Sequence, residues 1–288
     1  MSTNFNGKID LHSHTTASDG FLTPTELARL AAERGVSVLA ITDHDSTSGL
    51  AEARIASDGL GLRVVTGVEF GTYMAESEIH MLGYFFDPAH PAMEQSLRAL
   101  RDERFERGRR MVEKLQELGV PVQWERVQEI AAGGSVGRPH VGRALIEKGY
   151  ARSIDDAFER YLSRGKPAYV ERTQLSPIEC ISLVHDAGGV AVLAHPTWVA
   201  NAEGLLPTLV EAGLDGIETF YGLYPPETVA WLAGLAQQYG LVPTGGSDYH
   251  GQPGLDHAEL GSVSVPLQHF EELERRASVR QQLAASSK

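Results

Sequence analysis

The stretch GKIDLHSHTTASDGFLTPTELARLAAERGVSVLAITDHD, residues 7–45, contains one complete strand–helix–strand unit. The short apolar runs Ile9–His12 and Val38–Thr42 predict two strands. Between them, residues 23–26 (TPTE) combine a threonine N-cap, a proline at the first helical position and a glutamate that can close a capping box, and Gly35 ends this helix. A unit of this kind is typical of a sheet whose neighbouring strands are parallel and joined by helices.

The same alternation continues along the rest of the chain. Further strands are predicted at Arg63–Val68, Ile79–Phe85, Val190–Ala194, Gly216–Phe220 and Val242–Gly245. Residues 176–179 (SPIE) repeat the helix-starting pattern, and the pair Gly188-Gly189 ends that second helix. Seven strands with helices between many of them indicate an α/β fold with a mainly parallel sheet, either open or closed into a barrel.

The middle of the chain differs from the rest in charge and pattern. Residues 98–172 carry a net charge of +4, whereas the remaining residues carry −17. The run Ser96–Leu118 predicts a long arginine-rich helix, and Val141–Lys148 and Ile154–Ser163 predict two shorter ones. We therefore expect residues 100–167 to form a helical insertion, with residues 1–99 and 168–288 forming the α/β body.

The overall composition excludes several classes of protein. With 288 residues, of which 42% are hydrophobic and 22% charged, the chain can bury a large core. The formal charge of −13 argues against an anionic membrane or long nucleic acid as a stable partner. The single Cys180 excludes an internal disulfide and a cysteine-based zinc site. Because we also recognise no signal peptide and no membrane-spanning run, we expect a cytoplasmic protein.

Residue types that bind metal ions gather where the predicted strands end. Such ends meet at one edge of a parallel sheet, so side chains distant in sequence converge there. The segments are HSH at 12–14, TDHD at 42–45, GVE at 67–69, the isolated His80, AHP at 194–196 and SDYH at 247–250. On an extended segment, the spacing of His12 and His14 places both rings on one face. Burying so many polar groups together without compensation would be costly, so the set indicates a metal cluster.

In this order the segments resemble the motifs of the PHP family, named for polymerase and histidinol phosphatase. The resemblance implies a distorted seven-stranded β/α barrel that holds three divalent metal ions. The implied ligand sets are His12, His14, Glu69 and Asp248 for the first ion, Glu69, His80 and His195 for the second, and Asp19, His44 and His250 for the third. Many phosphatases of the family have a histidine where this chain has Asp19, and a carboxylate favours manganese, iron or magnesium over zinc.

Within the family the chain is similar to a stand-alone branch of small phosphoesterases. These enzymes remove the 3'-phosphate from 3',5'-bisphosphonucleosides, and some trim short RNA from the 5' end. The resemblance thus implies a metal-dependent phosphatase, with manganese as the first choice of cofactor. Its substrate would be a small phosphorylated nucleotide, such as adenosine 3',5'-bisphosphate, which it would convert to AMP.

Phosphate ester hydrolysis by clustered cations suggests roles for several residues. Glu69 would bridge two ions that hold the attacking hydroxide. Asp19, His44 and His250 would contact the phosphate, and the third ion and the nearby imidazoles would neutralise it.

The basic insertion is expected to bind the second phosphate of the substrate. Arginine recognises phosphate as a planar fork, so Arg104 and the loop from Ser135 to Arg138 are predicted contacts. The alternative for the helix arginines is a solvated face with i, i+4 partners, such as Glu103 for Arg107 and Glu106 for Arg110.

Other functions fit parts of the same pattern. The chain could be a 5'-to-3' exoribonuclease on short RNA, or a small-molecule phosphatase like histidinol phosphatase. An amidohydrolase also begins with HxH, but no lysine follows a middle strand here to become carboxylated. A metal-binding module without activity is disfavoured because all nine ligand positions are filled and no polymerase domain follows.

Overall fold

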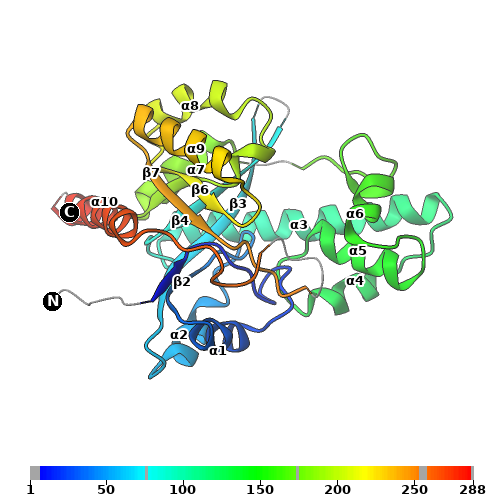
Figure 1. The fold of residues 1–288 in the computed structure, drawn as a ribbon. Helices are drawn as coiled ribbons and strands as arrows, with labels where there is room; N and C mark the ends of the chain where they lie inside the picture. Colours follow the sequence, from blue (N-terminus) through cyan, green and yellow to red (C-terminus); the bar gives the residue numbers. More distant parts are fainter. Residues whose placement is uncertain (1–6, 75–76, 173–174, 253–257, 287–288) are drawn as a thin grey trace.

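The computed structural model describes residues 7–74, 77–172, 175–252 and 258–286, in which seven strands form one sheet in chain order (Figure 1). The strands are β1 (Lys8–Asp10), β2 (Val36–Ile41), β3 (Arg63–Met74), β4 (Ser77–Tyr84), β5 (Val190–Leu193), β6 (Gly216–Tyr221) and β7 (Val242–Gly246). All neighbours are parallel except β4, which is antiparallel to both β3 and β5. Only two residues separate β3 from β4, too few for a parallel crossover. The seven strands predicted from the sequence and the mainly parallel sheet are confirmed.

Hydrogen bonds between the first and last strands close the sheet into a barrel. The backbone N–H of Leu11 donates to the carbonyl of Gly245 at 3.1 Å, and that of Asp248 donates to His12 at 2.9 Å. Ser13 and Tyr249 form a parallel bridge just beyond the strand ends. The sheet is therefore a seven-stranded β/α barrel, which resolves the choice between an open and a closed sheet.

Helices surround the barrel on the outside. They are α1 (Pro24–Glu33), α2 (Leu50–Ser57), α7 (Pro177–Asp186), α8 (Ala202–Glu211), α9 (Pro226–Tyr239) and α10 (Leu267–Ser286). The capping boxes predicted at the starts of α1 and α7 are both formed, by Thr23 with Glu26 and by Ser176 with Glu179. In Figure 1, α7, α8 and α9 lie on one side of the sheet and α1 and α2 on the other, with α10 away from the insertion. No helix in the described part of the chain has the length and apolar character needed to cross a membrane.

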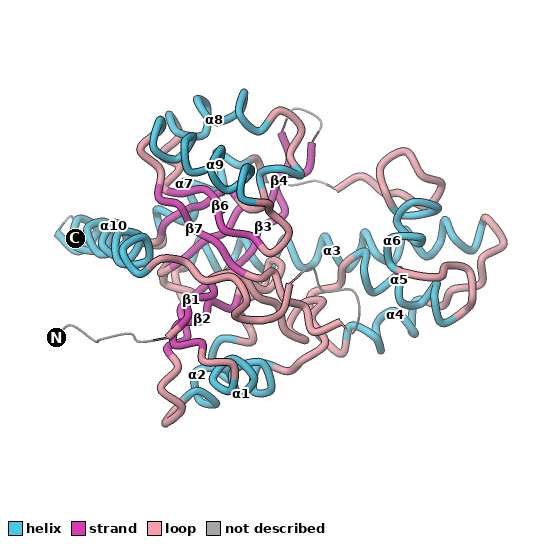
Figure 2. The backbone as a smooth tube through the Cα atoms, viewed as in Figure 1, coloured by secondary structure: helices cyan, strands magenta, loops and turns pink. Residues whose placement is uncertain are grey.

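A long helix connects the barrel to a separate group of helices (Figures 1 and 2). This helix, α3 (Pro91–Glu117), is followed by α4 (Trp124–Ala131), α5 (Arg138–Glu147) and α6 (Ile154–Ala157), which a π-helical turn extends to Leu162. Side chains from the first half of α3, such as Leu97, pack in the barrel core, and those from the second half, such as Leu115, pack in a core of the insertion. The helix starts at Pro91, five residues before the predicted start, because its first turns cover the barrel.

Buried ion pairs attach both ends of the insertion to the barrel. Asp45, in the loop after β2, accepts hydrogen bonds from Arg104 on α3 and, at 2.7 Å, from Arg172 on the segment that returns from the insertion. Arg172 also donates to Glu103 at 2.8 Å. Gly71 leaves the space for this approach, since a Cβ there would lie 2.7 Å from Arg172 Nη1. Burial raises the pKa of Asp45, but the two guanidinium groups outweigh it and lower that pKa to about 2.

Replacement of Asp45 should destabilise the protein strongly. Asp45→Asn removes the negative charge between two buried guanidinium groups, and breaking a buried pair in this way costs about 3–5 kcal/mol of unfolding free energy. Urea denaturation would measure the loss. The matched control is Glu113→Gln, which breaks the exposed pair with Arg109 and should cost less than about 1 kcal/mol. Equally small losses in both variants would mean that Asp45 does not anchor the insertion.

Candidate metal centre

Nine polar side chains gather at one end of the barrel. They come from β1 and its loop (His12, His14, Asp19), from the end of β2 (His44), from within β3 and β4 (Glu69, His80), and from the ends of β5 and β7 (His195, Asp248, His250). These are the nine residues that the sequence singled out, and the structure brings all of them together. Their roles as ligands remain a proposal.

The centre of this cluster is the carboxylate of Glu69, which is only 1% exposed. Five imidazole nitrogens lie within 3.4 Å of its two oxygens. Those of His12, His14 and His44 are 3.4, 3.2 and 3.2 Å from Oε2, and those of His80 and His195 are 2.7 and 3.1 Å from Oε1. Asp248 Oδ1 adds a second carboxylate, 3.3 Å from His12 Nε2 and 3.1 Å from His14 Nε2. Glu69 is therefore placed where one carboxylate can be shared between cations.

The donor atoms form three overlapping groups that could each hold an ion. The groups are His12, His14, Glu69 and Asp248; His44, Glu69 and His80; and His14, Asp19, His44 and His250. The first has the same members as the set implied by the resemblance. In the second, His44 stands in place of His195, which contacts Glu69 from outside the group. The third contains His14 in addition to the implied set.

The state of these atoms fits divalent cations. Buried polar atoms in proteins nearly always have a hydrogen-bond partner. Here His12 Nε2, both ring nitrogens of His14, His44 Nδ1 and Asp19 Oδ1 are buried without one among the described residues. The 3.1–3.4 Å separations in the first group are also about those of two ligands that each lie ~2.1 Å from one ion.

The carboxylates control the protonation of the cluster. Burial lowers the pKa of His14, but the close carboxylates of Asp248 and Glu69, 3.1 and 3.2 Å away, outweigh it and raise that pKa to about 10. Burial also lowers the pKa of His80, but Glu69 and Glu78 outweigh it and raise it to about 9. Without cations, these imidazoles therefore carry the positive charge that the carboxylates need. A metal ion binds neutral imidazole and must displace those protons.

Two residues that orient the cluster were missed from the sequence. Glu218, fully buried in β6, lies 2.9 Å from His12 Nδ1 and accepts a hydrogen bond from the backbone of His195 at 2.7 Å. Tyr221 donates to Asp248 Oδ2 at 2.7 Å. Partners of this kind fix the orientation of ligand side chains. The sequence did contain one signal. Glu218 is a carboxylate in the middle of Gly216–Phe220, the one predicted strand to which no metal ligand had been assigned.

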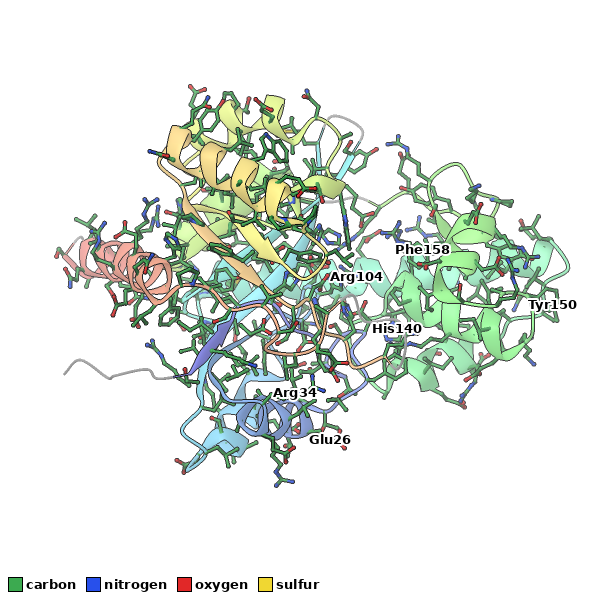
Figure 3. All side chains as sticks on the ribbon, in the orientation of Figure 1. Glu26, Arg34, Arg104, His140, Tyr150 and Phe158 are labelled. Atoms are coloured by element: carbon green, nitrogen blue, oxygen red, sulfur yellow. The ribbon has the colours of Figure 1, made fainter. Side chains whose placement is uncertain are left out.

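A cavity of about 590 Å³ extends from the cluster to the insertion. Figure 3 shows Arg104, His140 and Phe158 where the barrel and the insertion meet. The guanidinium groups that line the cavity are those of Arg104, Arg107, Arg138 and Arg143. Two of them are already paired with carboxylates: Arg104 binds Asp45, and Arg138 binds Glu78 at 2.6 Å. Glu78 in turn lies 3.5 Å from His80, so Arg138 is linked to the cluster.

Arg107, and not the predicted Ser135, lies at the wall of this cavity. Ser135 is 4% exposed and does not line this cavity; its backbone N–H donates to Ala17 instead. Arg107 lines the cavity, and its Nη2 is buried without a hydrogen-bond partner among the described residues. Burial, with the charge of Arg138 next in size, lowers the pKa of Arg107 to about 10. Arg107 thus forms no exposed pair with Glu103; its Nε donates to the carbonyl of Val170 at 2.9 Å, and its side chain lies at the wall of the cavity.

Part of the remaining wall of the cavity is apolar. Ile154 and Phe158 belong to the insertion, and Trp198 and Val199 follow β5 in and after a short 3-10 helix, Pro196–Trp198. Trp198 is 51% exposed, and its ring centroid lies 4.5 Å from that of His195. The cavity therefore combines a carboxylate–imidazole end, a row of arginines and an apolar face.

Comparison with known proteins gives consistent matches. Residues 10–167 match the PHP domain family. The 5'-3' exoribonuclease Rnm of Salmonella typhimurium is 41% identical over 86% of this chain and 87% of its own length. A 3',5'-nucleoside bisphosphate phosphatase of Chromobacterium violaceum is 35% identical over 93% of this chain and 97% of its own. The crystal structure of a metal-dependent phosphoesterase from Bifidobacterium adolescentis has a TM-score of 0.85 at 32% identity, covering 94% of this chain and 96% of that one.

Manganese binding should strengthen as the pH rises towards about 9. The pKa values of His14 and His80, about 10 and about 9, mean that both rings hold protons at neutral pH in the metal-free protein, and each ion must displace them. Calorimetric titration in buffers of different ionisation enthalpy would count the protons released. Affinity that does not change with pH, with no proton release at neutral pH, would contradict this account of the cluster.

Proposed function

The chain belongs to the PHP domain family and is a metal-dependent phosphoester hydrolase, and we propose that its best substrate is a 3',5'-bisphosphonucleoside. It would remove the 3'-phosphate, converting adenosine 3',5'-bisphosphate to AMP. One observation carries this proposal: a single cavity is lined both by residues of the His/Asp/Glu cluster and by four arginines, so it offers places for two phosphates. The apolar wall beside them suits a nucleobase.

The nine residues of the cluster would hold up to three divalent ions, with manganese as the expected metal and Glu69 shared between sites. When bound, the ions would supply an activated water and neutralise charge on the phosphoryl oxygens. Asp19, His44 and His250 line the cavity and would position the 3'-phosphate. Glu218 would hold the ring of His12 in orientation through its contact at Nδ1.

The arginines would fix the other end of the substrate. Arg107 and Arg143 each have a guanidinium nitrogen without a hydrogen-bond partner among the described residues, and Arg104 and Arg138 line the same cavity while paired with carboxylates. We propose that these residues, from the insertion of residues 100–167, bind the 5'-phosphate as a fork. This insertion would then act as a cap that recognises the substrate, and the barrel would carry the reacting groups.

A second candidate function is 5'-to-3' hydrolysis of short RNA, which the 41% identity to an exoribonuclease favours. The chemistry at the cluster would be the same. The ester broken would still join phosphorus to the 3'-oxygen of a 5'-phosphorylated nucleotide, but the phosphate would also carry the next nucleotide. Such a substrate would use the same arginines and would differ only beyond the scissile phosphate.

Three substrates separate these possibilities in the presence of manganese: a 3',5'-bisphosphonucleoside, the matching 3'-monophosphate, and a short 5'-phosphorylated RNA. A charge-assisted contact to the 5'-phosphate contributes about 1.5–3 kcal/mol, so kcat/KM for the bisphosphate should exceed that for the monophosphate about ten- to a hundred-fold. Released phosphate and nucleotide would be measured. Equal efficiencies would exclude a pocket for the second phosphate, and faster cleavage of the RNA would assign the exoribonuclease activity.

Arg107→Ala should lower kcat/KM on the bisphosphate by about ten- to a hundred-fold and leave a simple aryl phosphate nearly unaffected, since only the former has a second phosphate to contact Arg107. The matched control is Arg109→Ala on the same helix, where Arg109 is exposed and paired with Glu106 and Glu113. Arg138 is a poorer test because its loss would also disturb Glu78 beside His80. If Arg107→Ala lowered kcat/KM equally on both substrates, Arg107 would instead support the fold or the metal ions.

A further inference from the structure

The loop that carries Asp19 is bound by the insertion as well as by the barrel. This segment, residues 15–21, is named here the Asp19 loop. On the barrel side, Ser18 Oγ donates to Asp43 at 2.6 Å, and the backbone N–H of Phe21 donates to the carbonyl of His250 at 2.7 Å. These bonds hold the loop against the strand ends but do not contact the carboxylate of Asp19.

On the insertion side, Arg143 of α5 reaches the backbone of Asp19 itself. One guanidinium nitrogen of Arg143 donates to the Asp19 carbonyl, and the guanidinium carbon lies 3.7 Å from the ring centroid of Phe21. Such a stacked, hydrogen-bonded arginine is a specific contact that a lysine would reproduce only in part. Arg143 therefore fixes the loop on both sides of Gly20.

The start of α5 and the loop before it make further contacts with the Asp19 loop. The ring of the buried His140 accepts a hydrogen bond from the backbone of Gly137 at 2.9 Å, and the ring also hydrogen-bonds to the backbone of Ser18. The backbone N–H of Ser135 donates to the carbonyl of Ala17 at 2.9 Å. At Gly134, a Cβ would lie 2.4 Å from the Thr16 carbonyl oxygen, so only a glycine allows this approach.

Asp19 is held by a different kind of backbone segment from Glu69. Glu69 lies within a strand, whereas Asp19 lies in a loop that packs between two bodies. Its oxygens are 3.6–3.8 Å from the nitrogens of His14, His44 and His250, further than the 2.7–3.4 Å around Glu69. The position of this carboxylate therefore depends on contacts from outside the barrel.

We propose that the insertion completes the third cation site, with His140 and Arg143 as positioning residues for Asp19. This inference rests on the metal centre proposed above. It means that the third ion, held by Asp19, His44 and His250 with His14, binds tightly only while the insertion is docked. Arg143 also lines the substrate cavity, so substrate contact with the insertion and binding of the third ion would strengthen each other, as coupled equilibria must.

Manganese titration of the intact protein, followed by calorimetry and by the electron paramagnetic resonance signal of unbound Mn²⁺, tests the proposal. Wild-type protein should bind three ions and Asp19→Asn two. In His140→Ala and Arg143→Ala, affinity for the third ion should fall about 10- to 100-fold, the usual effect of losing a residue that orients a ligand, while the first two ions bind as before. Arg143→Lys, which keeps one donor, should recover part of the affinity.

The control variant is Arg126→Ala, which removes an exposed arginine of the insertion that pairs with Glu129 and Glu147. It should bind three ions like the wild type, and thermal melting should show every variant folded. Unchanged third-ion affinity in both His140→Ala and Arg143→Ala would overturn this inference alone. Equal weakening of all three ions would overturn it too, by making the two residues general supports of the fold. Wild-type protein that binds two ions or none would overturn the third site or the metal centre itself.

Discussion

A buried carboxylate surrounded by imidazole rings is stable only if positive charge reaches it, and at Glu69 this requirement organises the rest of the molecule. Its five imidazole neighbours come from four strands or their ends, so the strands must meet at one point. An open sheet would leave β1 and β7 at opposite edges and separate His12 from Asp248. The bonds that join those two strands therefore close the barrel and complete the cluster together.

Local sequence features predicted the strands and the convergence of the nine side chains, because apolar runs and polar strand ends are visible without knowledge of contacts. The ion pair between Asp45 and Arg172 was not visible, since 127 residues separate its partners. Helical periodicity also placed Arg107 and Arg109 on one helix, but it could not tell which one is buried. Glu218 was not predicted because it lies within a strand, whereas the pattern that identified most of the other ligands was a polar residue at a strand end.

The acidic body must attract an anionic substrate, and the distribution of charge explains how this is possible. The basic segment lines the cavity beside the cluster, and the four arginines that it places there are all buried in whole or in part. Two of them, Arg104 and Arg138, are paired with Asp45 and Glu78, which keeps the segment folded against an acidic barrel. What remains for a ligand is local: the unpaired charges of Arg107 and Arg143, each with one guanidinium nitrogen that lacks a hydrogen-bond partner among the described residues, rather than a broad positive surface that would bind any polyanion.

Under the proposed function, α5 would join substrate recognition to metal binding. Arg138 faces the cavity at its first turn, and His140 and Arg143 hold the Asp19 loop within the next five residues. A rigid helix cannot move one of these side chains far without moving the others. The two ion sites proposed around Glu69 would depend on strands, which the barrel fixes, whereas the proposed third site would depend on a loop that this helix holds. In the proposed account, the third cation site therefore lies beside the segment that would contact the substrate, so chemistry at the cluster would respond to what occupies the cavity.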